Sequence, residues 1–292
     1  MNQYFISYLF SVLVAGTNGI AASFLSLSSY EIVFLRCSMA FVVVLLLFFL
    51  TQKGRFTLFQ HPRSLLFVIL SGASMGANWL FLYEAYDEIG VTLATLACYC
   101  GPVIVMALSP LLFRERLSLF KVCGFGVVFL GIILVNGQVF LAGNSGWGLF
   151  CGAMTMVTYA CMIIFNKFGT EISGLENSVV LFLVSSLVTG GFLVSRQGFH
   201  LTLLPSDYLP ILYLGLLSTG IANHLYFASM KRLPAQTISV CGYLEPLTAV
   251  ILSAVILHES MSLAQMIGAV CILGGALFCE MIPNKTAHSE QL

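Results

Sequence analysis

An acidic residue lies inside a long apolar stretch of this sequence. Glu245 precedes Pro246 in the segment 235–257, which holds no other charged residue. An ionised carboxylate deep in a membrane is costly, so such residues usually face a cavity or a partner. Pro246 lacks a backbone N–H and loosens the helix around it. We expect Glu245 either to carry a proton or bind an ammonium group, or, in a purely structural role, to hydrogen-bond a neighbouring helix in its protonated form.

Other polar and aromatic residues also lie within apolar segments. The Arg36 guanidinium suits bidentate recognition of a carboxylate, although its long side chain could instead reach the membrane surface or pair with Glu31. His224 can change charge near neutral pH, which makes it a second candidate for proton transfer, with a core histidine as the alternative. The remaining candidates for lining a cavity are Asn18, Asn78, Trp79, Tyr83, Tyr99, Tyr159 and Tyr243. Core packing is the alternative for each of them.

The sequence gives no sign of a cofactor, a metal site or a nucleic-acid surface. Its nine cysteines all lie in apolar segments, without the CxxC or Cys/His spacing of metal and redox sites. The formal net charge is zero, so no basic surface is offered to nucleic acid. An HExxH motif is absent, and no pair of aspartates lies within an apolar segment. We therefore expect no enzyme, no cofactor and no metal.

The composition is that of an integral membrane protein. Hydrophobic residues make up 59% of the chain and charged residues 8%, against about 45–50% and about 25% in soluble domains. Too few charged groups remain to cover a globular surface, so the surface must face lipid. A spanning helix needs about 20 mostly apolar residues. The segments that meet this requirement are 4–25, 30–51, 64–86, 91–113, 118–138, 146–166, 177–195, 208–230, 235–257 and 262–282.

These segments predict an all-α integral membrane protein with ten transmembrane helices. The first segment lacks the positive start of a signal peptide, so we expect it to be retained as a helix. Cytoplasmic loops carry an excess of Lys and Arg. With a cytoplasmic N-terminus, ten basic residues fall in cytoplasmic segments and only Arg196 in an outer loop. We therefore predict a plasma (inner) membrane protein with both termini cytoplasmic and a polar cytoplasmic tail, 283–292.

The two halves of the chain match each other at a constant offset of 144 residues. The offset pairs Tyr99 with Tyr243, Pro102 with Pro246, Glu115 with Glu259, Gly124 with Gly268, and Gly131 with Gly275. Each copy holds five predicted helices, an odd number, so the second copy (141–282) crosses the membrane in the opposite sense to the first (1–140). Inverted repeats of this kind occur in secondary transporters, with the substrate site near the midplane between the halves. The paired prolines predict matching helix breaks, either hinges or tolerated kinks.

The paired glycines and several peripheral carboxylates are expected to be structural. Small residues let helices approach closely, so the fifth and tenth helices should meet, within one chain or across a homodimer. Glu115 and Glu259 lie where their helices leave the membrane and are expected to cap or pair with the following helix. Glu84, Asp87 and Glu88 are expected to form a solvated rim at the end of the third helix.

The sequence also resembles a known family. The stretches "GPVIVMALSPLLFRERLSLFKVCGFGVVFLGIILVNG" and "EPLTAVILSAVILHESMSLAQMIGAVCILGGALF" are similar to the Pro … Glu-x-[Leu/Met]-Ser … Gly … Gly pattern of EamA domains in the drug/metabolite transporter superfamily. "AGTN" at 15–18, "FLRCSMA" at 34–40 and "GWGLFCGAMTMVTYA" at 146–160 resemble other parts of these domains. The resemblance covers nearly the whole chain as two tandem domains. It implies a ten-helix transporter fold and, commonly, efflux of amino acids or other small metabolites.

These features predict a secondary transporter that exports a small organic solute by alternating access. The site is expected around Tyr99, Tyr243 and Glu245, with Arg36 and His224 as further contributors. Proton antiport rests on Glu245 and His224 alone, and an uncoupled facilitator is the alternative within the same class. A membrane sensory or assembly subunit without flux is the alternative from a different class. The expected partners are the small-molecule solute and membrane lipid.

Overall fold

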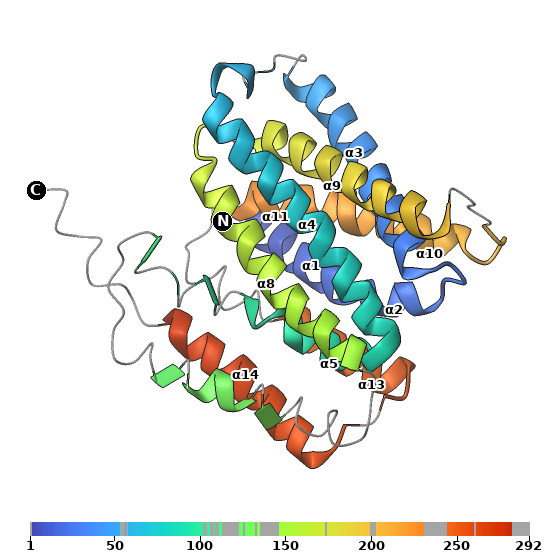
Figure 1. Cartoon of the computed structure of the whole chain (residues 1–292), viewed down its shortest axis with the longest axis vertical. Helices are drawn as coiled ribbons and strands as arrows, with labels where there is room; N and C mark the ends of the chain where they lie inside the picture. The colour runs from blue at the N-terminus through green and yellow to red at the C-terminus, as the bar shows by residue number, and fades with distance from the viewer. Residues whose placement is uncertain are drawn as a thin grey trace, which may run out of the picture.

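The computed structural model describes residues 2–52, 56, 58–101, 104–105, 108, 111–112, 123–124, 126–131, 133–134, 146–172, 174–198, 203–230, 244–259 and 261–281. Within these residues every regular element is a helix (Figure 1). The predicted segments 91–113, 118–138 and 235–257 lie partly outside the described residues.

The helices of the first half follow the predicted apolar segments. α1 (Asn2–Gly16) and α2 (Asn18–Ser23) meet at Thr17, and α3 (Ser29–Gln52) precedes the short 3-10 turn η1 (Leu58–Gln60). α4 (Pro62–Ile89) begins at a proline, whose missing N–H is not needed in the first helical turn. α5 (Val91–Cys98) follows Gly90, whose φ of 83° favours glycine.

The described part of the second half also consists of helices. Its elements are α8 (Gly146–Phe168), α9 (Gly174–Gln197), α10 (Tyr208–Leu212), the π-helix η2 (Tyr213–Ala222), α11 (Asn223–Met230), α13 (Leu244–Ile256) and α14 (Leu263–Met281). α10, η2 and α11 are continuous and fill the predicted segment 208–230. A π-helix of 10 residues is unusual, because π-helices occur mostly as single turns and often at functional sites.

Among the described residues, five helices are long and apolar enough to cross a membrane. They are Gln3–Ser23, Ser29–Thr51, Pro62–Ile89, Gly146–Phe168 and Gly174–Arg196. Large apolar side chains such as Leu50, Leu111 and Leu209 are exposed, which water would disfavour but lipid accepts. The protein is an all-helical membrane protein.

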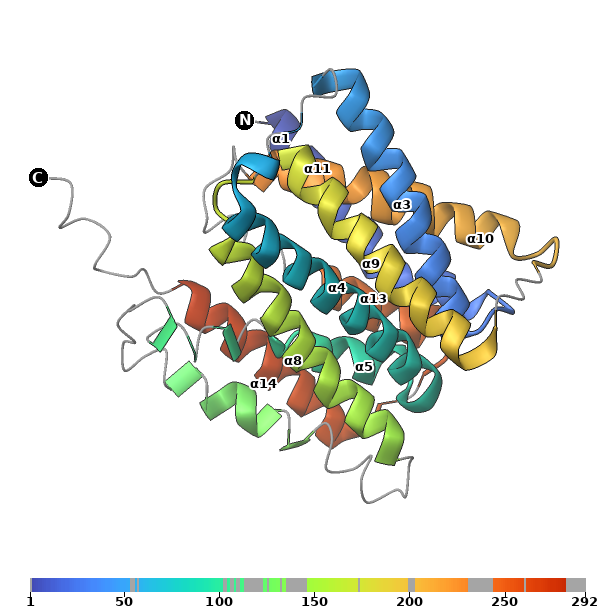
Figure 2. The ribbon, with the colours of Figure 1, turned by 45° about the horizontal axis from the view of Figure 1, so that its top comes forward.

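α4 is central to the packing of the bundle. It contacts both α8 and α9, and the three helices run side by side in Figures 1 and 2. α3 packs on α9 and η2, α1 on α11 and α13, and α5 on α8 and α13. Glycine allows the close approach of α4 to α9, because a Cβ added to Gly72 would lie 3.0 Å from the carbonyl oxygen of Leu181.

The paired glycines bring α14 against the helical residues 126–131. A Cβ added to Gly131 would lie 2.7 Å from the carbonyl oxygen of Gly268, and one added to Gly275 would lie 3.1 Å from that of Gly124. Both contacts join residues of the same chain, and the two segments lie side by side in both views (Figures 1 and 2). The structure thus confirms the predicted packing of these helices and shows it within one chain.

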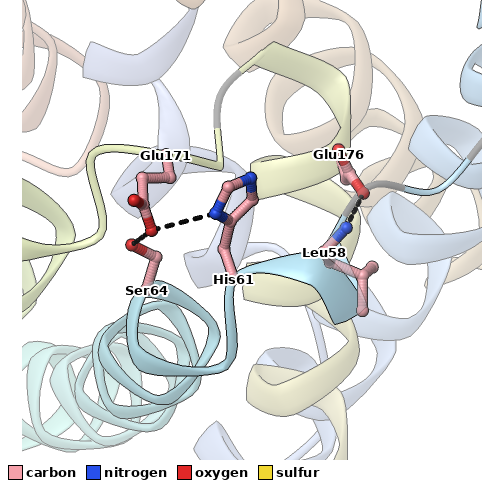
Figure 3. A network of polar contacts seen from close by, with 5 residues as sticks. All are labelled: Leu58, His61, Ser64, Glu171 and Glu176. Carbon is pink, nitrogen blue, oxygen red and sulfur yellow. Dashed lines mark hydrogen bonds and ion pairs between the residues drawn. The ribbon is translucent and has the colours of Figure 1, made fainter.

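At one end of the bundle, polar contacts join η1 and the start of α4 to the loop before α9 and the first turn of α9 (Figure 3). His61 Nδ1 lies 3.2 Å from Glu171 Oε2, which also accepts a hydrogen bond of 2.9 Å from Ser64 Oγ. The backbone N–H of Leu58 donates to Glu176 Oε1 at 2.6 Å. We call this group the His61 end contacts.

At the opposite end, buried Asp207 joins the loop before α10 to the loop before α3. Its carboxylate accepts hydrogen bonds from the Ser26 N–H at 2.9 Å, the Ser26 hydroxyl at 2.7 Å and the Leu204 N–H at 2.9 Å. We call these the Asp207 end contacts. The donors of Ser26, from its backbone and then its side chain, hold the pKa of Asp207 below its ordinary value.

Glu259 lies at the same end and caps a helix, but not the following one. Its two carboxylate oxygens accept hydrogen bonds from the N–H groups of Val91 at 2.8 Å and Thr92 at 3.0 Å, at the start of α5. The glycine at position 90 makes room for the carboxylate, which lies 3.0 Å from where a Cβ would be. Glu259 therefore joins the two halves, whereas its counterpart Glu115 lies outside the described residues.

Candidate functional site

A cavity of about 100 Å³ lies where helices from both halves of the chain meet. In the first half of the chain, residues from α1 to α5 form part of the cavity wall. Residues of α8 and α13 in the second half complete it. The lining residues are Ala15, Gly16, Asn18, Gly19, Arg36, Asn78, Trp79, Leu82, Tyr86, Thr95, Cys98, Tyr99, Tyr159, Glu245 and Ala249. This lining combines aromatic, amide, hydroxyl and charged groups in a largely apolar bundle, which is typical of a small-molecule site.

Arg36 brings a positive charge to the cavity wall. Its side chain is only 2% exposed. Its Nε donates to Thr219 Oγ1 at 3.1 Å, and its Nη1 donates to the hydroxyl of Tyr83. Its guanidinium carbon lies 4.4 Å from the ring centroid of Trp79, a cation–π contact worth about 2 kcal/mol when desolvated. Arg36 is thus held by hydroxyl groups and an aromatic face, and it forms no ion pair within the described residues.

The pairing of Arg36 with Glu31, one of its three predicted alternatives, does not occur. Glu31 Oε2 instead accepts hydrogen bonds of 2.8 Å from the backbone N–H and the hydroxyl of Ser28, which precedes α3. The structure places the guanidinium at the cavity, where a carboxylate could reach it.

Glu245 brings a carboxyl group to the same cavity, from the first turn of α13. Its side chain interacts with the hydroxyl of Tyr99, and the charge of Arg36 acts on it. α1 passes very close, because a Cβ added to Gly16 would lie 2.6 Å from the backbone oxygen of Glu245. Two ionisable groups of opposite sign therefore line one small cavity.

The π-helix η2 holds the residues around the cavity in place through its hydroxyl groups. Tyr213 hydrogen-bonds Thr17 at the junction of α1 and α2, and the hydroxyl of Ser218 donates to Asn18 Oδ1. Thr219 accepts the hydrogen bond from Arg36 described above. The second half of the chain thus fixes polar residues that the first half presents to the cavity.

Comparison with known proteins identifies the family of this chain. The family model described as "EamA-like transporter family" matches residues 4–137 and again residues 146–280. The chain belongs to the EamA-like transporter family. It is thus a membrane transporter of the drug/metabolite type, a class whose members are generally not enzymes.

Individual relatives of this EamA-like transporter are distant. It is 27% identical over 280 residues to "Uncharacterized transporter YxxF" of Bacillus subtilis (strain 168), covering 92% of this chain and 87% of the relative. It is 26% identical over 199 residues to "Probable amino-acid metabolite efflux pump" of Salmonella typhimurium, covering 63% of this chain and 65% of that protein. A solved structure titled "Crystal structure of protein" has a TM-score of 0.68 at 18% identity and covers 96% of this chain and 99% of its own. That likeness concerns the fold.

Seven of the residues predicted as candidates in this EamA-like transporter line the cavity together: Asn18, Arg36, Asn78, Trp79, Tyr99, Tyr159 and Glu245. Pro246 is buried beside Glu245. Tyr243 and Pro102 lie outside the described residues.

His224 is half-buried in α11 and is not among the residues that line the cavity. The structure therefore brings Glu245 to the cavity but does not place His224 beside it. Among the described residues, no group of three His, Cys, Asp or Glu side chains could hold a metal ion.

Three polar residues of the site were not predicted: Tyr86, Thr95 and Thr219. Tyr86 lies seven residues after Trp79, and Thr95 four residues before Tyr99. Residues at these spacings share a helix face, so the predicted aromatic residues could have indicated both. Thr219 lies 183 residues from its partner Arg36 along the chain, and no local spacing indicates such a contact.

Proposed function

We propose that this protein is a secondary transporter that exports a small organic solute, an amino acid or a related metabolite, by alternating access. The observation that carries the proposal is the small cavity between the halves of the chain, lined by Arg36 and Glu245. A guanidinium recognises a carboxylate, and a carboxyl group can bind an ammonium group or carry a proton. A relative named as an amino-acid metabolite efflux pump supports the solute class and the direction.

The proposed fold is ten spans in a 5+5 inverted repeat, with domains 1–140 and 141–282. Several pairs of helix contacts support this fold. In each pair, replacing every helix by its counterpart in the other half turns one contact into the other. The contact of α4 with α9 corresponds to that of η2 with α3, and the contact of α5 with α8 corresponds to that of α13 with α1. The contacts of Gly131 and Gly275 with each other's helices are likewise reciprocal.

Alternating access needs contacts at each end that can open in turn. The His61 end contacts join residues 58, 61 and 64 of the first half to residues 171 and 176 of the second. The Asp207 end contacts and Glu259 join the halves at the other end. We infer that each access state breaks one set and keeps the other. The excess of basic residues supports a cytoplasmic His61 end, cytoplasmic termini and an inner-membrane location.

Proton coupling would run through Glu245. It is the acidic residue that lines the cavity, and its interactions with Tyr99 and Arg36 would change with its charge. In this proposal a proton and the solute occupy the site alternately, which gives antiport. His224 has weaker support as a relay, because it is not part of the cavity lining.

The test compares wild type, Glu245→Gln and the control Glu88→Gln in proteoliposomes. Glu88→Gln is the same chemical change as Glu245→Gln, made at an exposed position near the end of α4. The radiolabelled proteinogenic amino acids would be assayed for exchange at equal pH and for accumulation driven by a pH gradient. We expect Glu245→Gln to retain exchange and lose accumulation, while Glu88→Gln retains both. Exchange without accumulation in wild type indicates an uncoupled facilitator, and no flux of any amino acid contradicts the proposed solute class.

A further inference from the structure

Thr95 presents a hydroxyl group to the cavity without a hydrogen bond. It lies in α5, is 6% exposed and lines the cavity. Its Oγ1 has no hydrogen-bond partner within the described part of the chain. A buried hydroxyl without a partner is destabilising, because it has given up its hydrogen bonds to water. Native proteins contain few such groups, so this one requires an explanation.

The neighbouring helix residues do not supply the missing partner. Other hydroxyl groups of the bundle, such as those of Thr158 and Ser253, donate to the carbonyl oxygen four residues earlier, at 2.7 Å in each case. Thr95 makes no bond of this kind. The Tyr86 hydroxyl lies close enough to interact with Thr95, yet no hydrogen bond of acceptable geometry joins them.

The position of Thr95 relates it to the charged groups of the cavity. It precedes Tyr99 by four residues, so both side chains lie on one face of the α5 segment. Tyr99 interacts with Glu245, and Arg36 and Tyr86 line the same cavity. The hydroxyl of Thr95 is thus a neutral donor and acceptor one helical turn away from Tyr99, which interacts with the acidic group.

We propose that Thr95 is a specificity-determining residue whose hydroxyl hydrogen-bonds the transported solute. This assignment rests on the proposed transport function and narrows its substrate class. The solute must carry a polar group that faces α5, in addition to a carboxylate that faces Arg36. The cavity volume of about 100 Å³ restricts it to a small molecule, since a cavity of about 150 Å³ holds benzene.

Thr95→Val tests the assignment because it replaces the hydroxyl with a methyl group of similar size. Removing an unpaired buried hydroxyl should raise the melting temperature of the solute-free protein by about 2–4 °C. The same change should weaken solute binding by about 3- to 10-fold, the loss expected for one hydrogen bond between neutral groups. Thr95→Ser keeps the hydroxyl and should restore binding. Gain of stability with loss of binding is the signature of a ligand-binding group.

Thr155→Val is the matched control. The Thr155 hydroxyl accepts a hydrogen bond of 2.9 Å from Asn78 Nδ2 and donates one of 3.2 Å to the Asn78 carbonyl oxygen. Its replacement should therefore lower the melting temperature, opposite in sign to Thr95→Val. Tyr86→Phe tests whether Tyr86 is the true partner. If Thr95→Val loses its effect on binding in the Tyr86→Phe background, the hydroxyl serves Tyr86 and the assignment is overturned.

Binding would be measured by thermal shift and by exchange in proteoliposomes, with each of the proteinogenic amino acids as the solute. If wild type and Thr95→Val bind an amino acid equally, the assignment is wrong while the transport function stands. If Thr95→Val lowers the melting temperature of the solute-free protein, the hydroxyl has a partner in the fold, which also overturns the assignment. If wild type exchanges none of these solutes, the proposed solute class itself fails, and with it the role assigned to Thr95.

Discussion

The contact between Gly131 and α14 predicts a large difference between two otherwise similar alanine substitutions. In Gly131→Ala, the new methyl group would lie 2.7 Å from the Gly268 carbonyl oxygen, 2.8 Å from Ile272 Cγ1 and 2.9 Å from the Ile272 backbone nitrogen. Two of these three atoms belong to the backbone, so they cannot rotate away. Overpacking of this kind costs about 1–3 kcal/mol. Against this, alanine in a helix gains about 0.5–1 kcal/mol over glycine.

Gly126→Ala is the internal control, because a Cβ added there meets nothing within 4 Å. It keeps only the helical gain of about 0.5–1 kcal/mol. With the upper end of the overpacking cost, the two variants should differ in free energy of unfolding by about 3 kcal/mol. That difference corresponds to about 5 °C or more in melting temperature. Gly275→Ala should fall between them, because its nearest atom, Val128 Cγ2, is 3.0 Å away.

The assay is thermal unfolding in detergent, followed with a thiol-reactive dye that reports exposure of buried cysteines such as Cys37 and Cys98. Equal melting temperatures for Gly131→Ala and Gly126→Ala would refute the close contact. A change of oligomeric state in Gly131→Ala, with unchanged stability of the single chain, would show instead that these helices meet across a homodimer.

Three further predictions concern the ends and the centre of the bundle. Arg36→Lys should reduce transport at least about 10-fold, because lysine lacks the planar fork that stacks on Trp79 and binds a carboxylate bidentately; exchange assays would measure this. Tyr83→Phe leaves an N–H donor of Arg36 unpaired and should lower the free energy of unfolding by about 1–3 kcal/mol. Thermal unfolding would measure this loss, and an unchanged stability would contradict the hydrogen bond between Arg36 and Tyr83. The pKa of Asp207 is lowered in the folded state. Its contribution to the stability of the fold is therefore fully present above its unfolded pKa of about 3.9 and is lost as pH falls through the folded pKa. Wild type should therefore lose stability in acid below about pH 4. Asp207→Asn lacks the carboxylate that accepts hydrogen bonds from Ser26, so its stability should fall less over the same pH range. Parallel profiles of stability against pH for the two proteins would exclude this role of Asp207.

The helix positions could be predicted largely from length and hydropathy. The predicted segment 30–51 became α3 (Ser29–Gln52), and 146–166 became α8 (Gly146–Phe168), because a membrane requires helices of this length. The place of Arg36, Glu245 and Tyr99 at the cavity could be anticipated because polar groups in apolar helices are conspicuous. The repeat offset predicted the contacts of the paired glycines for a similar reason: close packing leaves a pattern in the sequence.

Other features could not be predicted because they depend on contacts between distant segments. Glu259 caps α5, whose first N–H groups lie 168 residues away along the chain. The apolar pattern of 208–230 gives no indication that η2 is a π-helix. The cavity-facing side of α5 was hidden as well, because helices that are apolar nearly all round carry no periodic signal. Only the spacing of Thr95 from the predicted Tyr99, one helical turn away, could have indicated it.

The two halves fill the space around the cavity unequally. Gly101 occupies in the first half the position that Glu245 holds in the second, and a Cβ added to Gly101 would lie 2.7 Å from the ring of Tyr159. The counterpart of Tyr159 is Ala15, which leaves room beside Glu245. In the inverted repeat proposed above, exchange of the halves also exchanges the two faces of the membrane. Identical halves would then give inward-open and outward-open states of equal energy, whereas one acid on one side would make the balance between them depend on the charge that Glu245 carries.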